Sequence, residues 1–174
     1  VKNHLFSETG IYLRESRITD ANGQAGYAMA DGTYTIRIDY MGHQVWTEPI
    51  DITSMDSLDQ VLNHQDVIIT ALGDYNGDQQ PIKGSNVYLF TPFGSYSGLA
   101  GIADKNGQAG FSLPDMDYRV RLDYLGQQFW SDPFAQADTQ VLVNEGIAEV
   151  QLASGGNPLA DVPIMCFPVL VWIL

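Results

Sequence analysis

Cysteine and basic residues are scarce in this sequence, and both shortages limit what the protein can be. The single cysteine, Cys166, excludes a disulfide within the chain, so stability must come from the core and from neighbouring domains or chains. Only 8 Lys and Arg stand against 21 Asp and Glu, which gives a formal net charge of -13. That charge repels phosphate backbones and anionic lipid surfaces. We therefore predict that nucleic acid is not a partner. The apolar stretch 164–174 is too short to cross a bilayer, so we also predict no membrane insertion.

Catalytic motifs are missing as well. The sequence contains no Walker A motif, no Cys-x-x-Cys pair and no His-Glu-x-x-His motif. The sequence GSYSG at 94–98 has Tyr96 where a nucleophile elbow requires serine. We predict that the protein is not an enzyme and that it needs no cofactor.

Glycine and aromatic residues are abundant, and their pattern is that of β-structure. The chain has 17 Gly, 9 Tyr, 7 Phe and 3 Trp. Residues 118–124 alternate between apolar and charged side chains, as do residues 34–40, which is typical of strands with one buried face. Asn106-Gly107, like Asn22-Gly23, predicts a β-hairpin turn. Six or seven short strands at this spacing predict an all-β fold, a Greek-key β-sandwich.

An internal duplication organises the chain. Residues 5–50 align without a gap to 89–134, at an offset of 84 residues, and 20 of the 46 pairs are identical. The match continues more weakly, because 67–69 resembles 150–152 and 80–90 resembles 157–167. We predict three units: a first β-sandwich repeat lacking its first strand (1–63), a complete second repeat (64–144), and the start of a third (145–174), which could instead be a strand donated to a neighbouring subunit.

The second unit resembles a known family of repeats. Its stretch "GDQQPIKGSNVYLFTP", followed by "GIADKNGQAGFSLPDMDYRVRLDYLG", is similar to the carboxypeptidase-regulatory-like, or transthyretin-like, Ig-like β-sandwich repeats of bacterial surface proteins. The family's pattern is matched by Pro81, Gly84, Val87, Asp104, Gly107, Phe111, Leu113, Pro114, Tyr118 and Gly126. The sequence departs from it at Met116, where the family has glycine. The resemblance implies a stalk, spacer, adhesive or accessory module, located extracellularly or on the cell surface.

Strand complementation is the assembly mode that the repeats predict. The first unit has no equivalent of 67–73, so the edge that such a strand would pair with is open. Residues 148–153 are that same type of strand in the third unit, and the predicted assembly strand is Ala148, Glu149, Val150, Gln151, Leu152 and Ala153. An open edge invites a strand from another chain, and a head-to-tail contact of this kind propagates into a filament. The alternative is that the adjacent repeat of a longer chain supplies the strand.

Two ligand sites are further candidates, each with a structural alternative. Trp46 and Trp130 offer aromatic faces for stacking on sugar rings; the alternative, which aromatic residues favour, is core filling or packing between adjacent units. Asp74, Asn76 and Asp78 have spacing that suits oxygen ligation of Ca²⁺, but Gln79 stands where an EF-hand has glycine. An Asx-rich turn is the alternative there. We thus predict a structural module of an extracellular fibre, stalk or adhesin, with a carbohydrate-binding or accessory module as the alternative.

Overall fold

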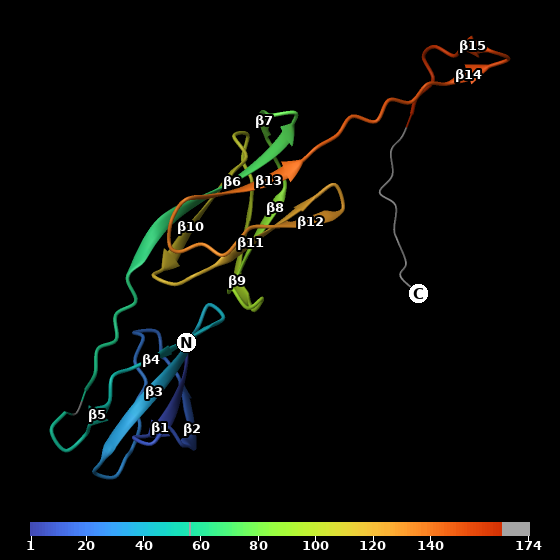
Figure 1. Cartoon of the computed structure of the whole chain (residues 1–174). Coiled ribbons are helices and arrows are strands. Elements are labelled where there is room, and N and C mark those ends of the chain that lie inside the picture. The colour runs from blue at the N-terminus through green and yellow to red at the C-terminus, as the bar shows by residue number, and fades with distance from the viewer. Residues whose placement is uncertain (56, 165–174) are drawn as a thin grey trace.

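The computed structural model of the chain describes residues 1–55 and 57–164, and all regular secondary structure in them is β-strand. The strands lie in three groups along the chain: an N-terminal sheet, a central sandwich and a C-terminal hairpin (Figure 1). The predicted all-β class is therefore confirmed. Residues 165–174 of the predicted third unit lie outside the described residues.

The central sandwich consists of two sheets. One has the order β10-β6-β13, with β7 also paired to β6, and its strands are β6 (His64–Tyr75), β7 (Asp78–Pro81), β10 (Gln108–Pro114) and β13 (Thr139–Asn144). The other has the order β12-β11-β8-β9, and its strands are β8 (Asn86–Phe90), β9 (Tyr96–Ile102), β11 (Arg119–Tyr124) and β12 (Gln127–Trp130). Strand β13 pairs with β6 in parallel, and the other pairs in these two sheets are antiparallel.

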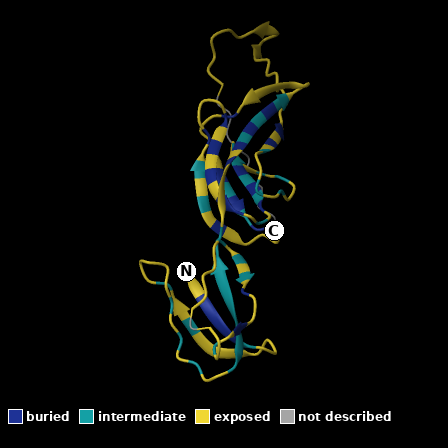
Figure 2. Ribbon diagram, turned by 90° about the vertical axis from the view of Figure 1, so that its left-hand side faces the viewer, coloured by how far each residue is buried: buried dark blue, intermediate teal, exposed yellow. Residues whose placement is uncertain are grey.

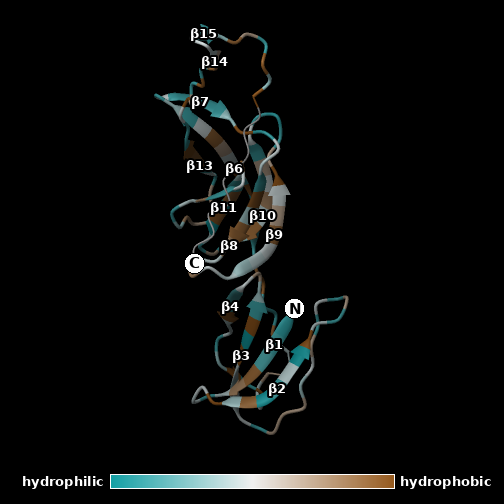
Figure 3. Cartoon of the chain, turned by 90° about the vertical axis from the view of Figure 1, so that its right-hand side faces the viewer, coloured by the Kyte–Doolittle hydropathy of each residue, from teal (hydrophilic) through white to brown (hydrophobic). Residues whose placement is uncertain are grey.

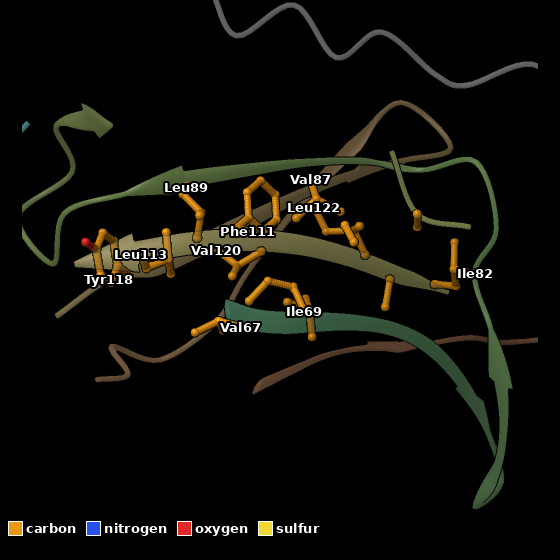
Figure 4. Close-up of a cluster of buried hydrophobic side chains, with 14 of the residues drawn as sticks. Val67, Ile69, Ile82, Val87, Leu89, Phe111, Leu113, Tyr118, Val120 and Leu122 are labelled. Atoms are coloured by element: carbon orange, nitrogen blue, oxygen red, sulfur yellow. The ribbon is translucent and has the colours of Figure 1, made fainter. Parts of the chain in front are cut away.

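The core lies between these two sheets, and the period-2 pattern of the sequence places it there. Val67 and Ile69 of β6 are fully buried, as are Val120 and Leu122 of β11 (Figure 4). Each such side chain contributes about 1.5–3 kcal/mol when it leaves water completely. The alternation predicted for 118–124 thus places its apolar residues in the core.

The hairpin predicted at Asn106-Gly107 is wrong, because the two flanking strands belong to different sheets. Strand β9 pairs with β8 and strand β10 pairs with β6, so this turn carries the chain from one sheet to the other. Asp104 Oδ1 accepts hydrogen bonds from the backbone N–H groups of Asn106 and Gln108, at 2.8 and 2.9 Å. Gly107 has φ +75°, and a Cβ there would lie 2.5 Å from the Ala71 carbonyl oxygen, so only glycine fits.

The N-terminal sheet repeats one sheet of the sandwich and lacks the other. Its order is β2-β1-β3-β4, with β5 paired to β3, and its strands are β1 (Lys2–Ser7), β2 (Tyr12–Ile18), β3 (Thr33–Tyr40), β4 (His43–Trp46) and β5 (Ile50–Asp51). At an offset of 84 residues, this is the order β9-β8-β11-β12. Residues 24–30, which align with β10, belong to no strand. Strand β10 pairs only with β6, and residues 1–55 contain no equivalent of β6.

The C-terminal segment, residues 145–164, leaves the sandwich after β13 and ends in a short hairpin of β14 (Ala153–Ser154) and β15 (Asn157–Pro158). Figures 1 and 2 show this hairpin standing away from the sandwich. All residues of the segment are exposed, and they include the apolar side chains of Ile147, Val150, Leu152, Leu159, Val162 and Ile164.

Candidate functional site

The inner face of the N-terminal sheet is built like a core but is only partly covered. Ile36 and Ile38 align with the fully buried Val120 and Leu122, yet both are half-buried. Leu5, which pairs with Ile36 from β1, is 3% exposed. Figure 2 shows mostly intermediate and exposed residues on this sheet, and Figure 3 shows hydrophobic positions along its strands. The sheet presents an apolar face without the second layer that covers the same face in the sandwich.

The predicted assembly strand is not formed as one strand. Residues 148–152 have no regular structure, and Ala153 pairs with Pro158 in the β14–β15 hairpin. Leu159 N–H donates to the Leu152 carbonyl at 2.8 Å, just as Ile82 N–H donates to the Ala71 carbonyl at 3.0 Å beside the β6–β7 hairpin. The C-terminal hairpin therefore has the same pattern as β6–β7, with shorter arms.

We match the residues of the two hairpins by these hydrogen bonds. Leu152 takes the position of Ala71, and two residues earlier Val150 takes that of Ile69. The sequence alignment had instead placed Leu152 on Ile69, which is a shift of two residues. Because side chains alternate with period 2, the same side chains still face the core position. Val150 is 54% exposed and Leu152 37%, so both are available for burial.

Trp46 and Trp130 lie at the ends of β4 and β12, each in an aromatic cluster on the outer face of its sheet. The clusters are equivalent: Trp46 packs on Phe6 with ring centroids 4.7 Å apart, and Trp130 packs on Phe90 at 4.9 Å. Each Phe also contacts a Tyr, Tyr12 or Tyr96, with centroids 5.3 Å apart. Trp46 is 48% exposed and Trp130 40%, so part of each indole faces solvent.

An arginine and an aspartate accompany each aromatic cluster. Arg37 forms an ion pair with Asp39, and Arg121 with Asp123, with 2.9 Å between nitrogen and oxygen in both cases. The guanidinium carbon lies 5.7 Å from the Phe6 ring in one cluster and 5.4 Å from the Phe90 ring in the other. Cation–π contact of this kind fixes the arginine against the ring. Sequence reasoning had singled out the tryptophans and missed this basic and acidic pair, although both residues are identical in the aligned repeats.

Asp74, Asn76 and Asp78 lie at the tip of the β6–β7 hairpin. Asn76 and Gly77 form the turn, with φ of 52° and 85°, which is the positive-φ pair that a two-residue hairpin favours. Asp74 uses both carboxylate oxygens locally, accepting from Gly77 N–H at 2.9 Å and from the Gln79 amide at 3.1 Å. Among the described residues, no three His, Cys, Asp or Glu form a group that could hold a metal ion. The calcium site stays a prediction, and the turn explains these residues on its own.

A joint between the N-terminal sheet and the central sandwich was not predicted from the sequence. The tip of the β3–β4 hairpin (41–43) packs on the β8–β9 loop (91–96): a Cβ on Gly42 would lie 3.1 Å from Thr91 Cγ2 and 3.2 Å from the Tyr96 carbonyl oxygen. The His43 ring meets Tyr118 edge-on, with centroids 5.1 Å apart. Its Nε2 is buried and has no hydrogen-bond partner in the described part of the chain.

Burial in the joint shifts the pKa values of His43 and Tyr118. Burial lowers the pKa of His43 below 6.5, against the opposing effect of the nearby Asp117 carboxylate. Burial also raises the pKa of Tyr118 to about 12, with smaller contributions from Tyr40 and Asp115. Both groups are therefore held neutral at physiological pH, as the apolar contact between them requires.

No protein-family model and no curated protein matches the chain, so the resemblance to carboxypeptidase-regulatory-like repeats remains an inference from the residues. Among solved structures, the chain is similar to GBS52, a minor pilin of Streptococcus agalactiae, with 13% identity over 88% of this chain and 86% of that one, and a TM-score of 0.50. It also matches BcpA, the major pilin subunit of Bacillus cereus, with 16% identity over 75% of this chain and 42% of that one, and a TM-score of 0.37.

A further match is the Bacillus anthracis TIE protein, with 16% identity over 82% of this chain and 29% of that one, and a TM-score of 0.34. At these identities the likeness to the minor pilin shows a shared β-sandwich architecture. No helix in the described residues is long and apolar enough to cross a membrane.

Proposed function

We propose that this chain is a structural module of an extracellular fibre or stalk, and that its units assemble head-to-tail by β-strand complementation. The observation that carries the proposal is the half-covered inner face of the N-terminal sheet, whose equivalent in the sandwich is fully buried. The fold shared with a minor pilin supports a role as a structural module of a fibre. The formal charge of -13 also suits a soluble protein at a surface.

The sandwich indicates how a complementing strand would bind. Strand β6 pairs with β10 there, with Ile69 opposite Ala109 and Val67 opposite Phe111. By equivalence, residues 148–153 (the donor segment) would pair with residues 24–30 (the acceptor segment), with Val150 opposite Ala25 and Ala148 opposite Tyr27. The acceptor segment would then become a strand, and the two together would form the missing layer over Ile36 and Ile38.

Burial supplies the driving force. Val150 and Leu152 would leave water, and the half-exposed parts of Ile36 and Ile38 would be covered. Full burial of such a side chain is worth about 1.5–3 kcal/mol, and new ladder hydrogen bonds form in addition. The strand comes either from another copy of the chain or from the neighbouring repeat of a longer chain.

Charged substitutions on the two faces of the donor segment test the proposal. Val150→Asp should abolish concentration-dependent self-association in sedimentation velocity, because an unpaired carboxylate cannot enter a core. Gln151→Asp, on the opposite face of the same segment, is the matched control and should associate like the wild type. A monomeric wild type, or equal behaviour of the two variants, would contradict strand complementation between copies. Denaturing electrophoresis of native material then separates the sources of the strand: a 19.2 kDa band indicates strand exchange, and a much larger band indicates a covalent array.

A carbohydrate-binding role is a second candidate, and the two equivalent aromatic clusters favour it. Each leaves an indole face partly exposed beside a fixed arginine and aspartate, a combination that offers stacking and hydrogen bonding to a sugar. Binding to a glycan array that is lost in Trp46→Ala and Trp130→Ala would support this role. An array without binding would contradict it.

A further inference from the structure

The joint between the N-terminal sheet and the sandwich is built from two surfaces that each occur twice. The first surface is a hairpin tip: 41–43 in β3–β4 and 125–127 in β11–β12. The second is a loop: 91–96 between β8 and β9 and 7–12 between β1 and β2. Within the chain, tip 41–43 is docked on loop 91–96. The other tip belongs to the central sandwich and the other loop to the N-terminal sheet (Figure 1).

Several residues of the second tip and of the surface around the second loop are more exposed than their equivalents in the joint. Leu125 is 74% exposed, whereas the equivalent Met41 is half-buried in the joint. In the loop, Ser7 is half-buried, whereas the equivalent Thr91, on which Gly42 packs, is 4% exposed. Ile11 is 64% exposed, and its equivalent Ser95 is exposed as well. Tyr118, which receives His43, is fully buried, and its equivalent Tyr34 is half-buried. The Tyr34 hydroxyl is nevertheless held in the equivalent way, because it donates to the Ala30 carbonyl just as the Tyr118 hydroxyl donates to the Pro114 carbonyl.

The chain also leaves both tips in the same way. Just before the first tip, the Tyr40 hydroxyl is hydrogen-bonded at 3.1 Å to Nε2 of His64, the residue at which β6 begins. At the second tip, Tyr124 and Glu145 line the same hollow, where the C-terminal segment begins. Burial, and then interaction with the Glu145 carboxylate, raises the pKa of Tyr124. By the hairpin register, Glu145 takes the position of His64, as Leu152 takes that of Ala71.

A hollow of about 480 Å³ beside the second tip marks the place where such a contact would continue. It is lined by Tyr124, Leu125, Gln127, Phe129, Glu145 and neighbouring residues at the end of β13. Its walls are therefore the exposed tip itself and the beginning of the segment that the proposed function assigns to strand donation. Tip and donor segment leave the sandwich from the same place, so both can reach one partner.

We propose that the exposed tip 125–127 docks on loop 7–12 and Tyr34 of a second copy of this chain, repeating the joint that tip 41–43 makes within the chain. This inference rests on the proposed function and deepens it, because it names the second contact between consecutive copies. In the joint within the chain, the sandwich receives both tip 41–43 and strand β6. Likewise the N-terminal sheet of the next copy receives both tip 125–127 and the donor segment. The docked tip and the donated strand together would fix the angle between consecutive copies. A donated strand alone would not, because residues 145–147 connect it to the sandwich without regular structure.

Site-directed crosslinking tests the docking. In a Cys166→Ser background, Leu125→Cys and Ile11→Cys place one thiol on the tip and one on the loop, both at exposed positions. A short bis-maleimide reagent should then produce a ladder of covalent dimers and longer oligomers. The matched control pairs Leu125→Cys with Ile102→Cys, which is 68% exposed on β9, and should give a yield several-fold lower. Salt of about 0.15 M or more should be present, because copies of charge -13 repel each other less at a Debye length of about 8 Å.

The outcomes separate this inference from the proposed function. A ladder above the control yield supports docking of the tip on the loop. Crosslinking no higher than in the control, while the wild type still self-associates through residues 148–153, overturns the docking and leaves strand complementation standing. No crosslinking and no self-association at any concentration overturn both.

Discussion

The N-terminal sheet and the central sandwich carry the same strand order on related sequences, yet only the sandwich has a closed core. The aligned positions Ile38 and Leu122 illustrate the difference, since the first is half-buried and the second fully buried. Local sequence is therefore enough to specify β2-β1-β3-β4. In the sandwich, the second layer formed by β6, β10 and β13 covers such a sheet. Strand β10 pairs with β6, so we infer that residues equivalent to β10 form a strand only when a strand equivalent to β6 is present.

Truncation of the equivalent core positions should give the largest contrast. Leu122→Ala should destabilise the sandwich by about 2–5 kcal/mol, because it removes buried methyl groups and leaves a cavity. Ile38→Ala should cost the isolated chain about 1 kcal/mol, since that side chain is already partly in water. Hydrogen exchange in each region, measured over a series of urea concentrations, gives the change in free energy of unfolding for each variant. Equal losses would show that the N-terminal sheet is already closed.

Two equivalent turn glycines should give the next contrast. Gly107→Ala should cost about 2–4 kcal/mol, because the new Cβ meets the Ala71 carbonyl oxygen and φ is positive. Gly23→Ala carries only the positive-φ penalty of about 1–2 kcal/mol, because no atom lies within 4 Å of its Cβ position. The denaturation midpoints of the two variants measure this difference in stability. A Gly23→Ala penalty as large as that of Gly107→Ala would mean that the first turn is also packed against a strand.

The joint should weaken at acid pH. Since the pKa of His43 in the folded chain lies below its ordinary value of 6.5, the imidazole binds a proton more tightly in the unfolded chain than in the folded one. The stabilisation from neutral His43 is therefore complete above about pH 6.5 and declines as the pH falls below it. Hydrogen exchange of tip 41–43 should become faster in that range. His43→Gln, the residue of the equivalent tip at Gln127, should remove the pH dependence; a dependence that persists would assign it to another group.

Chelation should have the smallest effect. Asp74 is occupied by its own turn, so removing divalent cations should leave the melting temperature of the sandwich unchanged. A fall of several degrees on chelation, reversed by Ca²⁺, would instead show that Asp74, Asn76 and Asp78 hold a metal.

The sequence predicted the strands well and their partners less well. Alternation identified β3 and β11, and the offset of 84 residues aligned β1, β2 and β4 with their equivalents. The Asn-Gly rule failed at 106–107, because a turn motif is local and does not specify which sheet the next strand joins. At Asn76-Gly77 the sequence offered an Asx-rich turn as the alternative to a calcium site, and the structure forms the turn of a hairpin there. The joint had no signal in either repeat alone, because it depends on how two units meet.

Hydrogen exchange of the acceptor segment tests the central claim most directly. In the isolated chain at low concentration, backbone amides of 24–30 belong to no strand and should exchange rapidly. At high concentration, pairing with residues 148–153 should protect them together, and Val150→Asp should abolish that protection while Gln151→Asp preserves it. If these amides stay equally exposed at every concentration in the wild type, the N-terminal sheet does not receive its missing layer from this strand.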